Sequence, residues 1–393
     1  MTGSNPGTSR IASLDIIRGA VMVLMAVDHV RVYAGVPPGG PDPAVFFTRW
    51  ITHFCAPAFF FLAGTGAFLY GQKTSKAALS RFLATRGLIL VLLELTVIRI
   101  SWTFNFDYAN YMLAGVIWSL GWCMVLLALL VRLPLGAIAG IGLAIIAGHN
   151  LADPHFREWS QAAQSSPMGW LWQILYFGGG FKLFGSGPPL IILYSLIPWI
   201  GVMAAGYAFG WVMLQPAVRR DRLCLSIGLG AVAIFLVLRG FNLYGNPFPW
   251  GGPDSQMPAL LGFLNTNKYP ASFLFLLMTL GPTIALIPLL ERARGALVRW
   301  LTVFGRVPLF YYLLHIPLIH LVAVLISLVR TPASTGWLFT NHPMMPPEVP
   351  EGYVWSLGLL YLVTLGVVVL LYFPCRWFAA KKAASGNPWL RML

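Results

Sequence analysis

The sequence predicts an all-α fold, a polytopic transmembrane bundle of about ten spans. Composition and the spacing of apolar stretches both indicate it. Of the 393 residues, 58% are hydrophobic and only 10% are charged, and apolar stretches of the roughly 20 residues that a spanning helix needs recur along the chain. No stretch is left that is long enough for a separate soluble domain, so residues 1–393 are expected to form one domain.

The predicted spans follow one another with short connections. They cover residues 11–35, 45–70, 87–105, 111–131, 133–150, 188–214, 223–243, 270–290, 301–329 and 353–373. Lysine and arginine collect in the cytoplasmic loops of membrane proteins. Most basic residues fall on one side of these spans, and the other side holds only Arg157, Lys182, Lys268 and Arg330. Both termini are therefore predicted to be cytoplasmic.

The composition also argues against several other classes of protein. The formal net charge of +14 is spread over short loops, where orientation and anionic lipid headgroups account for it, so no nucleic-acid partner is expected. The four cysteines lie in or beside apolar segments without metal-type spacing, so neither a metal site nor a disulfide framework is predicted. The first apolar segment is too long and too charged for a cleavable signal peptide and is expected to remain as a span.

The first span carries ionisable residues that hydrocarbon does not tolerate without a reason. These are Asp15, Arg18, Asp28 and His29. Charged groups at membrane depth are costly, so they face a bundle interior or a wet cavity and mark a functional path. With about 100° of rotation per helical residue, Asp15, Arg18 and His29 fall on one stripe of the helix. One face of this helix is therefore expected to line a site.

Ionisable residues of the first span and of other spans fall at two depths. The outer depth holds Asp28, His29, Arg49, His53, Arg239, His315 and His320. The inner depth holds Asp15, Arg18, Glu94 and Arg306. Arg49 and His53 are one helical turn apart and are expected on the same face. The sequence predicts two polar tiers joined through the membrane.

Some of these residues also have purely structural interpretations. Asp15 and Arg18, at i and i+3, can form an ion pair that orients the helix, or they can bind a ligand, and the sequence leaves both open. Asp28 points about 100° away from His29 on a helix, which favours an ion pair with Arg31 or with another span.

Three features of other spans are also interpreted structurally. His315 lies within a turn of two tyrosines, which favours a packing role. Glu94 is expected to pair with Arg99 or Arg18. Gly64-Thr65-Gly66 favours close helix packing, because small residues admit a neighbouring backbone.

Two outer loops are longer than a connection requires. Residues 149–187 contain three tryptophans and a run of glycines, and residues 244–269 are rich in proline and glycine. Either loop can cap a cavity and offer a stacking face to a sugar. Anchoring of the tryptophans at the headgroup level explains the first loop equally well.

Several of these residues belong to motifs that resemble a known family. The motifs are Ser13-Leu14-Asp15-Ile16-Ile17-Arg18-Gly19, Leu24-Met25, Asp28-His29 and Pro57-Ala58-Phe59-Phe60-Phe61-Leu62-Ala63-Gly64. Together they resemble the heparan-α-glucosaminide N-acetyltransferase catalytic-domain family, part of a wider set of transmembrane acyltransferases. The segment from Phe304 to His315 is similar to that set as well. The resemblance is strongest over residues 10–72 and recurs at 303–320.

The resemblance implies transmembrane acyl transfer from acetyl-CoA, held from the cytoplasmic side, to an acceptor presented on the opposite side. Cationic side chains are suited to bind the CoA phosphates, and the candidates are Arg18, Arg81, Arg86 and Arg306. No metal is implied. The expected partners are an extracytoplasmic glycan or small-molecule acceptor and membrane lipids, and a homodimer is left open. A bacterial inner-membrane location is expected.

A histidine of the outer tier is the expected base. Its near-neutral pKa suits it to take a proton from an acceptor amine or hydroxyl. His29 is the first choice, with Asp28 as a supporting carboxylate, while His53 and His320 stay candidates. In animal members of the family an asparagine stands near the position of Asp28 and the catalytic histidine follows in the next loop, so the position of the base is left open. Direct transfer and an acyl-histidine intermediate are both compatible with these residues.

Two other functions use similar residues. A proton-coupled transporter would use buried Asp, His and Arg side chains as a relay, and it would show inverted repeats and broken helices. Prolines within several spans keep this alternative open, although no clear repeat is visible. A lipid-linked glycosyltransferase would carry an acidic pair in the first outer loop, where only Asp42 is found. The acyltransferase is the favoured interpretation.

Overall fold

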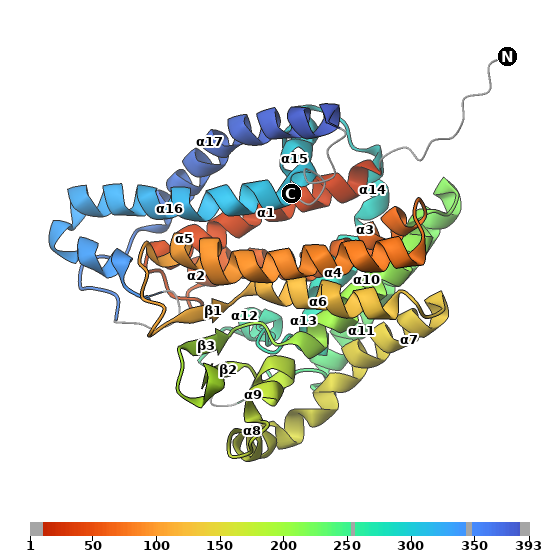
Figure 1. Ribbon diagram of the computed structural model, residues 1–393, viewed down its shortest axis with the longest axis horizontal. Helices are drawn as coiled ribbons and strands as arrows, with labels where there is room; N and C mark the ends of the chain where they lie inside the picture. Colours follow the sequence, from red (N-terminus) through yellow and green to blue (C-terminus); the bar gives the residue numbers. More distant parts are fainter. Residues whose placement is uncertain (1–10, 253–255, 343–347, 386–393) are drawn as a thin grey trace.

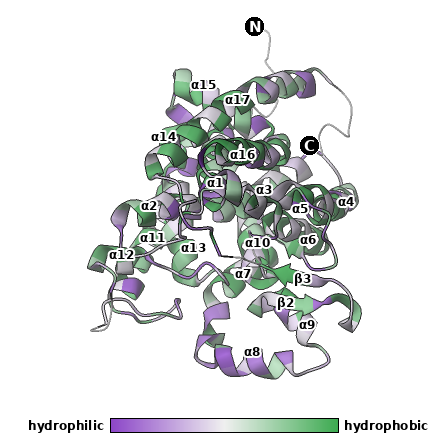
Figure 2. Ribbon diagram, turned by 90° about the vertical axis from the view of Figure 1, so that its left-hand side faces the viewer, coloured by the Kyte–Doolittle hydropathy of each residue, from purple (hydrophilic) through white to green (hydrophobic). Residues whose placement is uncertain are grey.

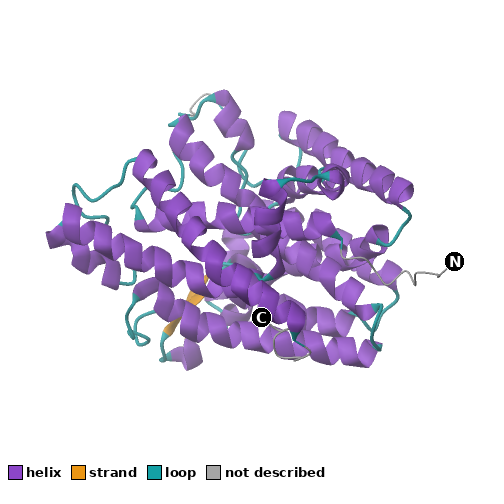
Figure 3. Cartoon of the chain, turned by 90° about the horizontal axis from the view of Figure 1, so that it is seen from above, coloured by secondary structure: helices purple, strands orange, loops and turns teal. Residues whose placement is uncertain are grey.

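The computed structural model describes residues 11–252, 256–342 and 348–385. It is a bundle of long helices with one small sheet at one end (Figures 1 and 3). In the described part of the chain, seven helical runs are long and apolar enough to cross a membrane. The prediction of an all-α polytopic membrane protein is confirmed. Helix α1, with its charged residues, and the shorter α6 lie in the same bundle and are not among the seven.

The first half of the chain forms an antiparallel series of helices. Two of them start at a side-chain cap: the Asp42 side chain accepts a hydrogen bond from the Val45 amide at 2.8 Å at the start of α2, and the Ser75 hydroxyl accepts one from the Ala78 amide at 3.2 Å at the start of α4. The elements are α1 (Ala12–Tyr33), α2 (Pro43–Trp50), the 3₁₀ turn η1 (Ile51–Phe54), α3 (Cys55–Gly71), α4 (Lys76–Leu93), the π-helical turn η2 (Glu94–Ile98), α5 (Arg99–Thr103), α6 (Val116–Leu130) and α7 (Leu135–Gly148).

The loop after α7 folds into short elements beneath the bundle. They are η3 (His149–His155), α8 (Phe156–Gln164), α9 (Gly169–Trp172), η4 (Gln173–Phe177) and η5 (Leu183–Gly185). Strands β1 (Met112–Ala114), β2 (Gly179–Lys182) and β3 (Pro189–Ile192) form a sheet in the order β1-β3-β2. Strand β1 runs parallel to β3 with Met112 opposite Leu190, and β2 runs antiparallel to β3. Figure 2 shows many hydrophilic residues on α8, at the bottom of the view, and many apolar residues on the bundle helices above it.

The second half adds helices on both sides of α1. They are α10 (Leu196–Met213), α11 (Ala217–Gly240), α12 (Ala259–Leu264), α13 (Phe273–Ala285), α14 (Ile287–Arg292), α15 (Ala296–Arg306), α16 (Pro308–Arg330), the 3₁₀ segment η6 (Pro332–Phe339) and α17 (Leu357–Ala384). Glycines let these helices approach closely. A Cβ atom on Gly19 would lie 1.9 Å from the Leu301 carbonyl oxygen, and one on Gly305 would lie 1.8 Å from that of Asp15. Helix α15 is thereby held against the inner half of α1.

Several predicted spans differ from the structure. The spans predicted at 111–131 and 188–214 begin with strands β1 and β3, the span predicted at 270–290 covers both α13 and α14, and the span predicted at 353–373 is a helix that continues to Ala384. The span predicted at 87–105 begins at Lys76, because the basic residues before 87 belong to α4 instead of a loop. The span predicted at 301–329 is two helices, and α16 starts at Pro308, which has no amide hydrogen to continue α15. The span predicted at 45–70 contains the 3₁₀ turn η1. The interpretation of Gly64 is confirmed, since a Cβ there would lie 2.0 Å from the Met203 carbonyl oxygen.

Candidate functional site

Two cavities lie along α1, one toward each end. The pocket at the Arg18 end of α1 is called the inner pocket, because this end is predicted to face the cytoplasm, and the pocket at the His29 end is called the outer pocket. The inner pocket has a volume of about 520 Å³ and is lined by residues of α1, α3, α4, α6, α15, α16 and α17. The outer pocket has a volume of about 430 Å³ and is lined by residues of α1, α2, η2, α5, β1, α6, α16 and η6 and of several loops. The inner pocket includes Arg18 of α1, and the outer pocket includes Asp28 and His29 of the same helix. The two polar tiers predicted from sequence correspond to these two cavities.

The inner pocket is lined by four cationic residues within an otherwise apolar wall: Arg18, Arg86, Arg306 and Lys382. Arg18 contacts Asp15 at 3.4 Å and donates to the Leu62 carbonyl at 3.2 Å, so it forms the predicted ion pair and also lines the cavity. Gly66 leaves room for it, because a Cβ there would lie 3.2 Å from Arg18 Nη2.

Two of these cations have no acidic partner. In the described residues, neither Arg86 nor Arg306 lies within ion-pair distance of a carboxylate, and the buried Nε of Arg86 has no hydrogen-bond partner. Arg81, by contrast, is exposed on α4 and does not line the pocket. The structure therefore gathers three of the four predicted donor-site arginines.

In the outer pocket, His29 forms a pair with His315 of α16. His29 Nδ1 lies 2.7 Å from His315 Nε2, and His315 Nδ1 lies 2.7 Å from the Tyr312 carbonyl oxygen. A carbonyl only accepts, so Nδ1 of His315 carries the proton and its Nε2 accepts. When both rings are neutral, His29 must then donate from Nδ1, which leaves a lone pair on its Nε2. The fold thus selects the tautomer of His29 that can act as a base from Nε2.

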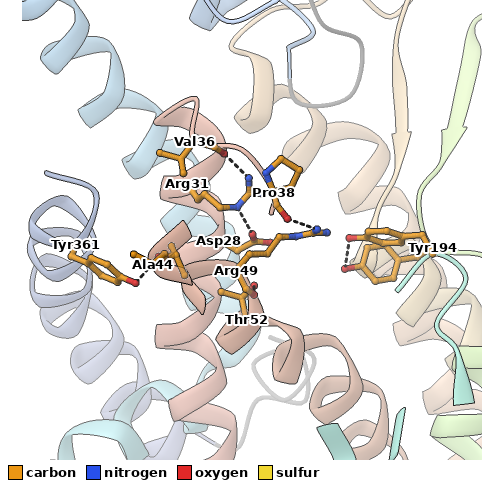
Figure 4. A network of polar contacts seen from close by, with 11 residues as sticks. Asp28, Arg31, Val36, Pro38, Ala44, Arg49, Thr52, Tyr194 and Tyr361 are labelled. Carbon is orange, nitrogen blue, oxygen red and sulfur yellow. Dashed lines mark hydrogen bonds and ion pairs between the residues drawn. The ribbon is translucent and has the colours of Figure 1, made fainter. Parts of the chain in front are cut away.

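Aromatic neighbours and an adjacent ion pair fix the surroundings of His29. Its ring packs edge-on against Trp102 with centroids 4.7 Å apart. Asp28 does not contact the ring and accepts instead from Arg31 Nε at 3.0 Å, which confirms the predicted pair. Arg31 also donates to the Val36 carbonyl at 2.9 Å, as Figure 4 shows. Asp28 is therefore an electrostatic neighbour of His29, one residue away in the chain.

The other two candidate bases lie outside both pockets. His53 is buried against Phe275 with ring centroids 5.3 Å apart, and neither of its nitrogens has a hydrogen-bond partner. The 3₁₀ turn that contains it breaks the helical phase from Arg49, so Arg49 lines the outer pocket and His53 does not. His320 faces the carbonyls of Ser101 at 3.0 Å and Leu338 at 2.9 Å, which joins α16 to η6.

The predicted pairing of Glu94 with Arg99 or Arg18 is wrong. Glu94 Oε2 instead accepts from the backbone amides of Ile117 at 2.9 Å and Trp118 at 3.1 Å. It satisfies the free amides at the start of α6, where the helix dipole favours a negative charge.

Arg99 and Arg239 are fully buried and hold outer loops in place. Arg99 donates to the Tyr111 carbonyl and the Asn105 side chain, and Arg239 donates to the carbonyls of Phe263, Phe248, Gly262 and Asn265. Neither guanidinium lines a pocket.

Two residues lie between the pockets. Tyr312 of α16 and Val116 of α6 line both cavities. The Tyr312 ring is edge-on to His29, with centroids 6.2 Å apart, and to His315 at 5.1 Å. Its hydroxyl makes no hydrogen bond to a described residue. The boundary between the cavities is therefore a side chain that no hydrogen bond holds.

Two histidines of the outer pocket region were not among the candidate bases. His315 was interpreted as a packing residue, although its depth in α16 matches that of His29. His342 was not singled out, because its loop has no periodic pattern. It is 7% exposed and lines the outer pocket, and neither of its nitrogens has a hydrogen-bond partner among the described residues. Burial, together with the nearby His320, lowers the pKa of His342 to about 3, against a weaker opposing effect of the Thr340 carbonyl. The ring is neutral, with one donor and one acceptor.

Comparison with known proteins adds one finding. A family model described as heparan-alpha-glucosaminide N-acetyltransferase, catalytic, matches residues 10–243, which is more than half of the 393 residues. The match includes α1 with Asp28 and His29, whereas α15 and α16 lie beyond it. No curated protein matches the chain. In the described residues, no three His, Cys, Asp or Glu side chains gather in a metal-binding arrangement.

Proposed function

The chain belongs to the heparan-alpha-glucosaminide N-acetyltransferase catalytic family, which makes it a membrane acetyltransferase, and on this premise we propose that it transfers the acetyl group of cytoplasmic acetyl-CoA to an acceptor on the other side of the membrane. One observation carries the proposal. A cationic pocket and a pocket with a histidine base lie along the same helix and share Tyr312 and Val116 as their boundary. A donor and an acceptor bound in these pockets would meet near His29.

The inner pocket suits the donor by charge and by shape. Arg86 and Arg306, without acidic partners, would form charge-assisted hydrogen bonds with the CoA phosphates. The apolar walls from α3 and α6 would take the pantetheine arm, with its thioester directed toward Tyr312. Arg18 sits at the same cavity and would add a third positive charge, part of which Asp15 offsets.

In the outer pocket, His29 Nε2 would take the proton of the acceptor amine or hydroxyl as that group attacks the thioester carbon. The C–S bond then breaks, and the sulfur leaves as a thiolate that takes up a proton in the inner pocket. His315 would hold the proton on His29 Nδ1 by accepting it in a hydrogen bond, and the nearby Asp28 carboxylate would stabilise the imidazolium. In the alternative, the Nε2 lone pair attacks the thioester carbon, the C–S bond breaks and CoA leaves as a thiolate; the acceptor then attacks the acetyl-histidine and releases the imidazole.

The transporter alternative has less support. A relay would need the buried cations of the outer tier to face a path, but Arg99 and Arg239 are committed to loop carbonyls. His320 likewise lies between two carbonyl oxygens.

Calorimetry on purified full-length protein tests the proposal. Acetyl-CoA and free CoA should both bind, because the phosphates supply most contacts, and their Kd values should be micromolar. The second step adds D-glucosamine, the sugar type in the family description, and follows CoA release with a thiol reagent. Absence of acetyl-CoA binding to folded protein would overturn the proposal. Release of CoA in a single burst without acceptor would favour the acetyl-histidine route.

A further inference from the structure

One wall of the outer pocket carries positive charge that the acetyl-transfer step does not use. Arg49 of α2 lines this wall and donates to the Pro38 carbonyl at 2.8 Å. Figure 4 shows its guanidinium extending toward Tyr194. Within the described ranges, no carboxylate lies within ion-pair distance of Arg49.

A second cation lies behind the tyrosines of the same wall. Lys268 is 7% exposed, and its Nζ lies 5.2 Å from the ring centroid of Tyr269 and 5.8 Å from that of Tyr194. The two tyrosine hydroxyls are 3.5 Å apart, and both tyrosines line the outer pocket. The structure shows no acidic partner for Lys268 among the residues it describes. Ring faces compensate a buried ammonium only in part.

The charges around the outer pocket do not balance. Arg31 is matched by Asp28 at 3.0 Å, and Glu94 is committed to the amide hydrogens at the start of α6. Arg49 and Lys268 are left over. Their effect is visible at Tyr269: burial alone would raise the pKa of its hydroxyl, but Lys268, Arg49 and the hydrogen bond with Tyr194 outweigh burial, and the pKa is lowered from its ordinary value.

We propose that Arg49, Lys268, Tyr194 and Tyr269 form an anion subsite, and that the acceptor carries a carboxylate or phosphate group that binds there while its nucleophilic group faces His29. The anion would accept hydrogen bonds from Arg49 and the tyrosine hydroxyls, with Lys268 supplying charge from behind the rings. Lys268 and Tyr269 lie outside the residues that the family model matches. The anion subsite depends on the proposed function in one respect only, which is that its ligand is identified as the acceptor.

Binding of three monosaccharide probes tests the subsite without requiring turnover. The full-length protein in uncharged nanodiscs is titrated with glucuronate, glucose 6-phosphate and neutral glucose, and tryptophan fluorescence is recorded, because Trp102 and Trp337 line the pocket. At least one anionic probe should bind about tenfold tighter than glucose, and its advantage should shrink as salt is raised. The two anionic arms distinguish a carboxylate from a phosphate ligand.

Substitutions of Arg49 and Lys268 test whether the anionic probe binds at the proposed subsite. Arg49→Gln and Lys268→Met should each reduce the advantage of the anionic probe at least threefold, or about 0.65 kcal/mol. Arg157→Gln and Lys182→Met, which replace exposed residues outside the pocket, should leave it unchanged. Arg49→Lys and Lys268→Arg keep the positive charge and should retain most of the advantage of the anionic probe. This result would show that the loss in the neutral variants comes from the missing charge and not from misfolding.

The outcomes are distinct for the subsite and for the enzyme. Equal binding of glucose and both anions, no binding of either anion up to about 50 mM, or an advantage that survives both charge-removing variants would overturn the subsite. Acetyl-CoA binding measured on the same sample reports on the inner pocket separately. Its loss together with retained anion binding would count against the proposed function and leave the subsite standing.

Discussion

The inner and outer pockets carry similar residue types but hold them in different ways. Arg86 and Arg306 of the inner pocket lie on helices without an acidic partner. In the outer pocket His29, Asp28 and Arg31 each have a defined neighbour within 3.0 Å. Unpaired cations suit a ligand that brings its own negative charge and is recognised mainly by charge. Side chains held in one orientation suit a step in which a proton moves between fixed atoms. Under the proposed function, this difference suits the inner pocket to donor binding and the His29 region of the outer pocket to the proton transfer.

Removing the base should have the largest effect. His29→Ala should lower kcat about 10³-fold, within the range for loss of a general base, while the Kd for acetyl-CoA stays within a factor of about two because the inner pocket is untouched. CoA release and calorimetry on one preparation measure both quantities. Turnover near that of the wild type in this variant would remove His29 from the reaction.

Replacing the histidine that orients the base should have the next largest effect. In His315→Phe the ring remains, but the acceptor for His29 Nδ1–H is lost, so His29 can adopt the unproductive tautomer. We expect kcat to fall about 10²-fold with KM for acetyl-CoA unchanged, and the pH profile of kcat to shift. His315→Gln should recover part of the loss, since its side-chain oxygen can accept. A variant that loses only thermal stability would show that His315 merely packs.

A substitution in the inner pocket should change the Kd for acetyl-CoA more than it changes kcat. Arg86→Gln removes a half-buried cation from a charge-assisted contact and should raise the Kd for acetyl-CoA about 20-fold, with kcat at saturating donor within about threefold. Arg222→Gln, an exposed cation of α11 outside the pocket, is the matched control and should behave as the wild type. A loss of kcat without a change in Kd would break the division between the pockets.

The boundary residue should affect the separation of the two reactants. Tyr312→Ala opens the side-chain barrier, so water from the outer pocket can reach the thioester. Hydrolysis of acetyl-CoA without acceptor should rise about fivefold, while donor binding is retained. The Tyr312→Phe variant keeps the ring and should not leak. Equal hydrolysis in both variants would show that the ring is not the barrier.

Much of α1 could be predicted from the sequence, because helical periodicity and the cost of buried charge are local properties. The Asp28–Arg31 pair, three residues apart, was predictable for the same reason. The contact between His29 and His315 joins residues 286 positions apart and depends on how α16 packs against α1. The similar predicted depth of His29 and His315 in the membrane was the one sequence signal for this contact. The fit of Glu94 to the start of α6 could not be predicted, because periodicity does not say which backbone amides a carboxylate meets.

The short sheet and the broken spans were missed for different reasons. Strands β1 and β3 are three and four residues long and lie in apolar runs that also contain a helix, and hydropathy cannot separate the two. The break between α15 and α16 did have a local signal. Gly305 and Pro308 bracket it, and proline at a first helical position is a common start.

The smallest predicted effect tests the boundary of the inner pocket itself. Arg81 was predicted to bind the donor, but it is exposed and does not line the cavity, whereas Arg86, five residues further along α4, does. An exposed cation is screened by salt, and its contribution to binding is small. Arg81→Gln should therefore raise the Kd for acetyl-CoA less than about threefold at physiological ionic strength, in the same calorimetric titration as Arg86→Gln. An effect as large as that of Arg86→Gln would mean that the CoA phosphates extend past the pocket onto the exposed face of α4.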